Sequence, residues 1–109
     1  MKTIIFAVAL LVSSLAAAEN PPSAQQVCLE MASVQKIAAE DRDAGQPPQV
    51  ALDHTMLVVA RQNQLQISNN KHMVNLIYFQ PGWQLSGDVL FERTYRTCLY
   101  PTKSYEPLK

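Results

Sequence analysis

The sequence has few of the residues that catalytic and cofactor-binding sites require. It contains two histidines, two cysteines and three glycines, and none of them belongs to a zinc-binding, nucleophile-elbow or phosphate-binding motif. A hydrolase would have to pair His54 or His72 with Ser68 or Ser86, but no catalytic motif surrounds either serine. We therefore expect no catalytic residue, no metal ion and no cofactor, and we predict that the protein is not an enzyme.

The sequence also lacks an excess of charge of either sign. Nine basic and nine acidic residues give a formal net charge of zero, and the longest charged stretch, at residues 40–43, mixes both signs. Nucleic acids and anionic membrane surfaces are bound mainly by concentrated positive charge. The composition therefore argues against a partner of either kind.

No hydrophobic run is long enough to cross a membrane, because a spanning helix needs about 20 apolar residues. The N-terminus has instead the features of an export signal. Lys2 precedes a mostly apolar segment at 3–15, and the alanines at 16–18 suit a signal peptidase. We expect residues 1–18 to be a cleaved signal peptide, which makes the mature protein periplasmic or secreted, with no membrane attachment after cleavage.

The rest of the chain is expected to be one small domain, residues 19–100, held by a disulfide. Cys28 and Cys98 are its only cysteines, and an even count in an exported chain is typical of disulfide bonding. The alternative, a redox pair, would normally have a CxxC spacing. Closing a loop of this length contributes about 4 kcal/mol in the chain-entropy model, which is a large term for a domain with a marginal core. Residues 101–109 lack apolar periodicity and are expected to form an extended tail.

The longest helical pattern covers residues 23–44, and the rest of the chain is expected to pack against it. Ser23 follows two prolines and can cap a helix N-terminus, while Gly45 suits the left-handed backbone that ends helices. Gln35 and Arg42 are polar interruptions of an otherwise apolar face. That face, with the helical spacing of three and four, consists of Ala24, Val27, Cys28, Met31, Val34 and Ala38.

Three further helices are predicted. The second begins at Gln49 and carries its apolar face as far as Ala60; the sequence leaves open whether residues 65–67 continue as helix or form a connector. The third begins near 68–70 and ends before Pro81. Its segment 74–79 also has a strand-like composition, but a lone strand would have no partner.

The last predicted helix runs from a Ser86 cap to Tyr100, where Pro101 ends it. Four helices with short connections predict an all-α fold, an up-down four-helix bundle stapled by one disulfide. Because the first and last helices are then antiparallel, Cys28 and Cys98 are expected to meet at one end of the bundle.

Arg42, Tyr78 and Trp83 are expected to gather at the opposite end. Arginine, tyrosine and tryptophan are enriched at binding hot spots, so we take these three residues as partner-binding candidates. Two structural alternatives stay open. Trp83 could be a lid over the end of the bundle, and Arg42 could pair with Asp43, Glu40 or the carbonyl groups of a helix end.

A family resemblance adds to this interpretation. The signal peptide, the cysteine in the first helix and the motifs Arg42-Asp43-x-Gly45, Tyr78 before Pro81 and Tyr95-x-x-Cys98 resemble small exported two-cysteine helical proteins of Gram-negative bacteria with no assigned function. The chain is more loosely similar to Rap1a/Tai-type periplasmic immunity proteins, helical domains with a disulfide that neutralise toxins delivered by type VI secretion. The resemblance implies a Gram-negative periplasmic location.

Together these observations predict an exported module that binds a protein partner of unknown identity. One version of this prediction is a protein similar to the immunity proteins. The alternative is a small-ligand carrier with a cavity between its helices. Met31, Met56 and Met73 would line that cavity, because methionine adapts to irregular pockets. The commoner role of methionines at such positions is to fill the core.

Overall fold

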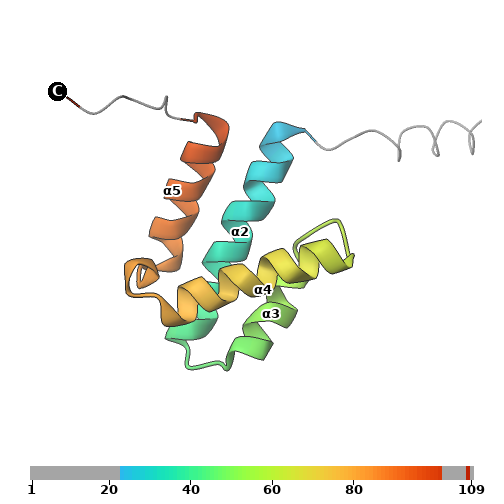
Figure 1. The fold of residues 1–109 in the computed structure, drawn as a ribbon, viewed down its shortest axis with the longest axis vertical. Coiled ribbons are helices and arrows are strands. Elements are labelled where there is room, and N and C mark those ends of the chain that lie inside the picture. The colour runs from blue at the N-terminus through green and yellow to red at the C-terminus, as the bar shows by residue number, and fades with distance from the viewer. Residues whose placement is uncertain (1–22, 102–107, 109) are drawn as a thin grey trace, which may run out of the picture.

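The computed structural model describes residues 23–101 and residue 108, and in this part the chain is helical with no strand (Figure 1). Its elements are α2 (Ala24–Asp43), α3 (Pro48–Met56), α4 (Gln64–Phe79), the 3-10 turn η1 (Pro81–Trp83) and α5 (Gly87–Leu99). The strand-like stretch 74–79 is therefore helix, within α4. The predicted signal peptide and most of the predicted tail lie outside the described residues.

Helix α2 begins and ends where the sequence predicts. The Ser23 hydroxyl accepts a hydrogen bond from the Gln26 backbone N–H at 3.1 Å, as an N-cap does. At the other end Gly45 has a φ of 80°. The N–H groups of Gly45 and Gln46 donate to the carbonyl oxygens of Arg42 and Asp41, so two of the free carbonyls at the helix end are satisfied.

Helix α2 is the centre of the fold, because each of the other three helices packs against it. Helix α5 lies antiparallel beside it, while α3 and α4 lie against its C-terminal half and α4 crosses it (Figure 1). The backbones of α4 and α5 do not lie side by side. An all-α fold with a Cys28–Cys98 disulfide is confirmed; an up-down bundle is not, because that topology places the third and fourth helices next to each other.

The core is small and rich in alanine. Ala32, Ala38, Ala39 and Ala51 are fully buried, and Ile77 and Leu90 are the largest fully buried apolar side chains. Small side chains let the helices approach closely, but they bury little apolar area. A domain with such a core depends strongly on its other constraints.

The N-terminal half of α2 is less buried than its apolar pattern predicts. Cys28 is 3% exposed and Val34 5%, but Met31 is 47% exposed and Val27 38%. The reason is that α3 and α4 do not reach this half, which extends beyond α4 together with the end of α5 (Figure 1). We call residues 24–33 of α2 and 94–99 of α5 the two-helix arm.

Helix α3 ends earlier than predicted. It stops at Met56, and the expected helical face as far as Ala60 is wrong. The Gln62 side chain donates to the carbonyl oxygens of Met56 and Val59 at 2.7 and 3.0 Å, and the Glu30 carboxylate accepts from the Ala60 N–H at 2.6 Å. These side chains satisfy the backbone groups that a longer helix would have paired internally.

Helix α4 begins earlier than predicted. Its cap is Asn63, whose side chain accepts from the Gln66 N–H at 2.8 Å, so residues 65–67 are helical. The predicted start at 68–70 is wrong. Asn63-x-x-Gln66 has the spacing of a capping box, and this was the signal in the sequence that would have located the start.

Asn70, a predicted cap residue, is instead buried inside the fold at 2% exposure. Its amide donates to the Thr55 hydroxyl at 3.2 Å and accepts from Gln66 at 2.7 Å. Thr55 in turn donates to the Leu52 carbonyl oxygen at 2.8 Å. Because buried polar groups must be paired, this chain of bonds ties α4 to α3.

Helix α5 agrees with its predicted limits. The Ser86 hydroxyl accepts from the Val89 N–H at 3.3 Å, and Tyr100 is the C-cap. Gly87 follows the cap and lies against α2, where a Cβ atom would be 2.9 Å from the Lys36 carbonyl oxygen. Only glycine allows this approach of the two helices. Beside it, the Lys36 ammonium lies 3.1 Å from the Asp88 carboxylate, and this hydrogen bond raises the pKa of Lys36.

Candidate functional site

The structure brings Arg42, Tyr78 and Trp83 to one junction, as the sequence predicts, and Arg42 holds it together. The Arg42 side chain is only 11% exposed. Its Nη1 donates to the carbonyl oxygens of Ile77 and Trp83, both at 3.0 Å, and its Nη2 donates to that of Leu85 at 2.7 Å. Nε donates to Asp43 Oδ1 at 3.0 Å. Arg42 thus pairs with Asp43 and with backbone carbonyl groups. These contacts correspond to the alternative in which Arg42 has a structural role instead of binding a partner.

Tyr78 also bonds within the chain. Its hydroxyl donates to the Gln46 carbonyl oxygen at 2.8 Å and so ties α4 to the turn after α2. Burial raises the pKa of this hydroxyl, and the Asp41 carboxylate raises it further, while the Arg42 guanidinium lowers it. The neutral phenol is therefore favoured, and it is the form that can donate to Gln46.

Trp83 is a partly buried lid that keeps one side toward solvent. It belongs to η1 and packs against the core cluster around Ile77 and Leu90. It also lines a surface hollow of about 430 Å³. We call this hollow the α2–α5 groove; its lining residues are Met31, Trp83, Arg93, Thr94, Thr97 and Cys98.

Covalent and polar bonds hold the two walls of the α2–α5 groove. The Cys28–Cys98 disulfide joins α2 to α5, with the two Cα atoms 5.5 Å apart, and Cys98 Sγ lies 4.0 Å from Met31 Sδ. Gln35 of α2 is buried, and its Oε1 accepts from the Thr94 hydroxyl of α5 at 2.6 Å. The walls of the groove are therefore fixed relative to each other before any partner binds.

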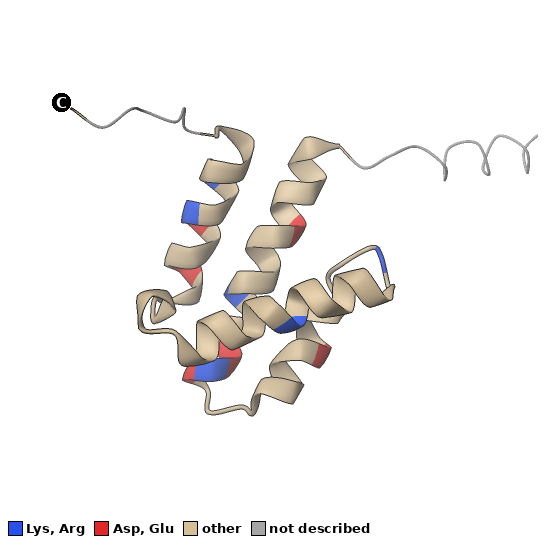
Figure 2. Ribbon diagram, in the orientation of Figure 1, with Lys and Arg blue, Asp and Glu red and all other residues tan. Residues whose placement is uncertain are grey.

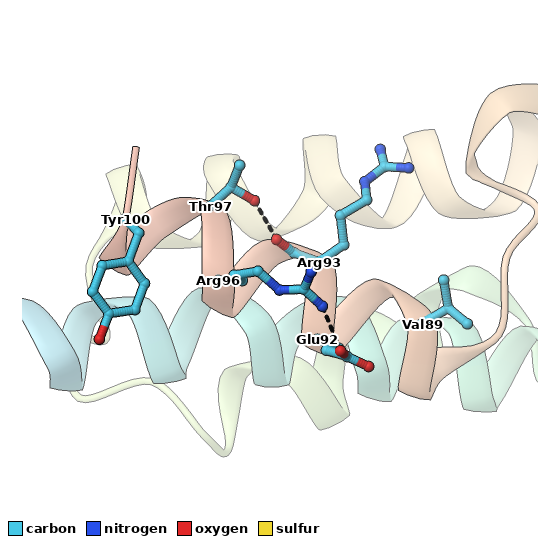
Figure 3. A pocket seen from close by; sticks show the side chains of 6 residues that line it. All are labelled: Val89, Glu92, Arg93, Arg96, Thr97 and Tyr100. Atoms are coloured by element: carbon cyan, nitrogen blue, oxygen red, sulfur yellow. Dashed lines mark hydrogen bonds and ion pairs between the residues drawn. The ribbon is translucent and has the colours of Figure 1, made fainter. Parts of the chain in front are cut away.

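A second hollow, of about 420 Å³, lies on α5, and Figure 3 shows the side chains that line it. Arg93 and Thr97 line both hollows. Arg96 is paired with Glu92, whereas the Arg93 guanidinium points away from that pair in Figure 3. The lining residues, Val89, Glu92, Arg93, Arg96, Thr97 and Tyr100, all come from one helix and its cap. One helix cannot enclose a small molecule, so this face suits a larger partner.

The three methionines of the carrier alternative do not share a hollow. Met31 lines the α2–α5 groove, and Met73 packs against the core cluster. The sulfur of Met56 accepts from the Asn70 amide at 3.3 Å. A third hollow, between α3 and α4, has a volume of only about 80 Å³ and is lined by Pro48, Gln49, Leu52, Lys71, Val74 and Asn75.

The structure gives a contact to several of the side chains that the sequence analysis considered for catalysis. His54 Nδ1 lies 2.7 Å from Asp41 Oδ2, a contact that joins α3 to α2, and Ser86 is occupied as a helix cap. Both cysteines are in the disulfide. Within residues 23–101, no three His, Cys, Asp or Glu side chains are grouped as metal ligands. The charged residues are scattered along the helices, and a mixed group of both signs stands at the end of α2 (Figure 2).

None of the helices that the structure describes is both long and apolar enough to span a bilayer. No family model matches the sequence, and neither curated proteins nor solved structures give a match. The candidate site therefore depends on its own geometry.

Sequence reasoning found Trp83 but missed most of the α2–α5 groove. It placed Met31 on the apolar face of α2, as a residue of the core. Helix α4 crosses the C-terminal half of α2 (Figure 1) and leaves Met31 exposed, so that Met31 and Arg93 line one hollow. The spacing of Arg93 and Thr97, four positions apart on one helical face, was the available local signal.

Proposed function

We propose that the protein is an exported protein-interaction module that binds a protein partner through the α2–α5 groove. The observation that carries this proposal is that Met31, 47% exposed, lies with Trp83 and Arg93 around one hollow on a disulfide-linked pair of helices. Tryptophan, arginine and methionine are enriched in the cores of protein interfaces.

Rigidity supports this interpretation. Binding costs free energy when side chains and loops become ordered in the complex, and a surface that is already fixed avoids part of that cost. Here the disulfide and the Gln35–Thr94 hydrogen bond join the walls, and Arg42 holds the Trp83 backbone. A small domain with so many constraints around one groove is suited to recognition.

The disulfide supports a location outside the cytoplasm, because such bonds persist in oxidising compartments. Periplasmic export rests on the N-terminal segment, and an immunity-like role rests on the family resemblance alone. For the small-ligand carrier, none of the three hollows described above, all within residues 23–101, is lined by more than one of the three methionines. Protein binding is therefore the function that we favour.

Photo-crosslinking in the cells that produce the protein tests this proposal. A photoreactive amino acid would replace Met31 in one variant and Leu29 in another. The two side chains are almost equally exposed, at 47% and 46%, but Leu29 does not line the groove. We expect one discrete protein adduct from the Met31 variant and none from the Leu29 variant. A third variant, with the photoreactive amino acid in place of Thr97, should give the same adduct as the Met31 variant, because Thr97 also lines the groove. Equal adducts from positions 29 and 31, or none from positions 31 and 97, would reject the groove as the binding site.

A further inference from the structure

The residues that line the α2–α5 groove include one positive charge and no negative charge. Arg93 is the only charged residue among the six that line it, and its guanidinium forms no ion pair with the described residues, whereas the neighbouring Arg96 is paired with Glu92. Arg93 also lines both the groove and the second hollow, the one on α5. A partner that covers both hollows would bury this cation, which is costly unless the partner supplies an anion.

The shape of the groove favours a helix as the occupant. Its lining comes from α2, α5 and the end of η1, and the two helices run antiparallel (Figure 1). Helix α5 contributes Thr94, Thr97 and Cys98 at the three- and four-residue spacing of one helical face, whereas α2 contributes Met31. An amphipathic helix fits such a surface by laying its apolar face into it. An extended peptide usually adds to the edge of a sheet, and the described part of the chain has no sheet.

We infer that the partner presents an amphipathic helix whose apolar face covers Met31 and Trp83 and whose aspartate or glutamate pairs with Arg93. This inference rests on the proposed function, because it names the chemistry of the segment that enters the same groove. Arginine can bind a carboxylate through two parallel hydrogen bonds, so the pair would set the register of the bound helix as well as its affinity.

A peptide selection tests the inference without knowledge of the partner. The probe is a displayed library of helical peptides of roughly 18 residues, about five turns, with randomised apolar and charged positions. The target is the purified chain with its disulfide intact. We expect enriched peptides to carry an apolar stripe flanked by at least one acidic residue. Arg93→Gln should weaken their binding about tenfold or more, whereas Arg61→Gln, at another exposed arginine, should leave it unchanged.

A second selection, against Arg93→Glu, should enrich lysine or arginine in place of the acidic residue. Peptides that lose binding with Met31→Lys but carry no acidic residue would overturn the inference and leave the proposed function standing. If the selected peptides bind Met31→Lys and Leu29→Lys equally, or if no peptide is enriched, the groove itself is rejected. A dimer of the chain that Met31→Lys dissociates in sedimentation would replace the acidic helix with a second copy of this protein.

Discussion

Arg42, at the end of α2, donates a hydrogen bond of 2.7 Å to the carbonyl oxygen of Leu85, although 43 positions separate the two residues. The same guanidinium binds the carbonyl oxygens of Ile77 and Trp83. The segment that carries Trp83 is therefore attached to α2 from both sides of η1. A residue that lies outside the α2–α5 groove thus positions the tryptophan that lines it.

Replacing Arg42 should destabilise this junction. Arg42→Met keeps an apolar stem but leaves the carbonyl groups of Trp83 and Leu85 without this donor, whereas the Ile77 carbonyl keeps the Gln84 amide as its donor. Unpaired buried polar groups cost about 1–3 kcal/mol each. Because water can reach part of the site, we expect a total loss of about 2–4 kcal/mol. Urea unfolding followed by the fluorescence of Trp83, the single tryptophan, measures it.

Arg61→Met is the matched control for this change, since Arg61 is exposed in the connection between α3 and α4. It should alter the free energy of unfolding by no more than about 0.5 kcal/mol. Equal stabilities of the two variants would show that solvent can replace the Arg42 guanidinium at the carbonyl groups, and the junction would then not depend on it.

The close approach of α5 to α2 predicts a cost for a single methyl group. In Gly87→Ala the new Cβ would lie 2.9 Å from the Lys36 carbonyl oxygen and 3.0 Å from Glu40 Cγ. A backbone oxygen cannot move aside as a side chain can, so we expect a loss of about 1–3 kcal/mol in the free energy of unfolding. Thermal unfolding followed by circular dichroism measures the difference.

Gly82→Ala is the control for Gly87→Ala. A Cβ at Gly82 would meet no atom within 4 Å, so alanine should leave stability unchanged or raise it by up to about 1 kcal/mol. If both glycine variants behave alike, the contact between Gly87 and α2 is not tight in solution.

Removing the disulfide should loosen the two-helix arm more than the rest of the fold. The bond closes a separation of 70 residues, and the double variant Cys28→Ala/Cys98→Ala should lose about 4 kcal/mol. Under native conditions, amide hydrogen exchange should accelerate more in residues 24–33 than in residues 73–79 of α4. Uniform acceleration in both segments would mean that the arm has no separate stability.

Tyr78 predicts a dependence of stability on alkaline pH. Burial raises its pKa above the ordinary value of 10.0. A group whose folded-state pKa is raised contributes stability that is fully present below its unfolded pKa and is lost as pH rises through its folded pKa. The ionised phenolate can no longer donate to Gln46. The contribution of Tyr78 should therefore be constant below pH 10 and fall above it.

The test compares the native chain with Tyr78→Phe in urea unfolding across this range. At neutral pH the variant should be about 0.5–1.5 kcal/mol less stable, the typical contribution of one hydrogen bond, and the difference should shrink as pH passes 10. Lys36 also has a raised pKa, but it is present in both chains and cancels. A difference that is independent of pH would contradict the role of the Tyr78 hydroxyl.

Local signals in the sequence located several boundaries correctly. Ser23 and Ser86 cap α2 and α5, and Gly45 ends α2, because a cap acts on backbone groups within a few residues. The start of α4 also had a local signal, the Asn63 cap, which the prediction overlooked. The end of α3 was predicted wrongly for a different reason. Glu30, a residue of α2, binds the Ala60 N–H, and no local pattern shows a partner that lies so far away along the chain.

The sequence by itself determined that the described part of the chain is helical, where α2 and α5 begin and end, and that the two cysteines pair. These outcomes depend on helical periodicity, on caps and on the presence of only two cysteines, all of which can be read without knowing how the helices pack. The tertiary structure alone decided that α4 crosses α2 instead of lying beside α5. That crossing exposes Met31, buries Asn70 and brings Trp83 to the α2–α5 groove, because the burial of a side chain depends on which distant helix covers it.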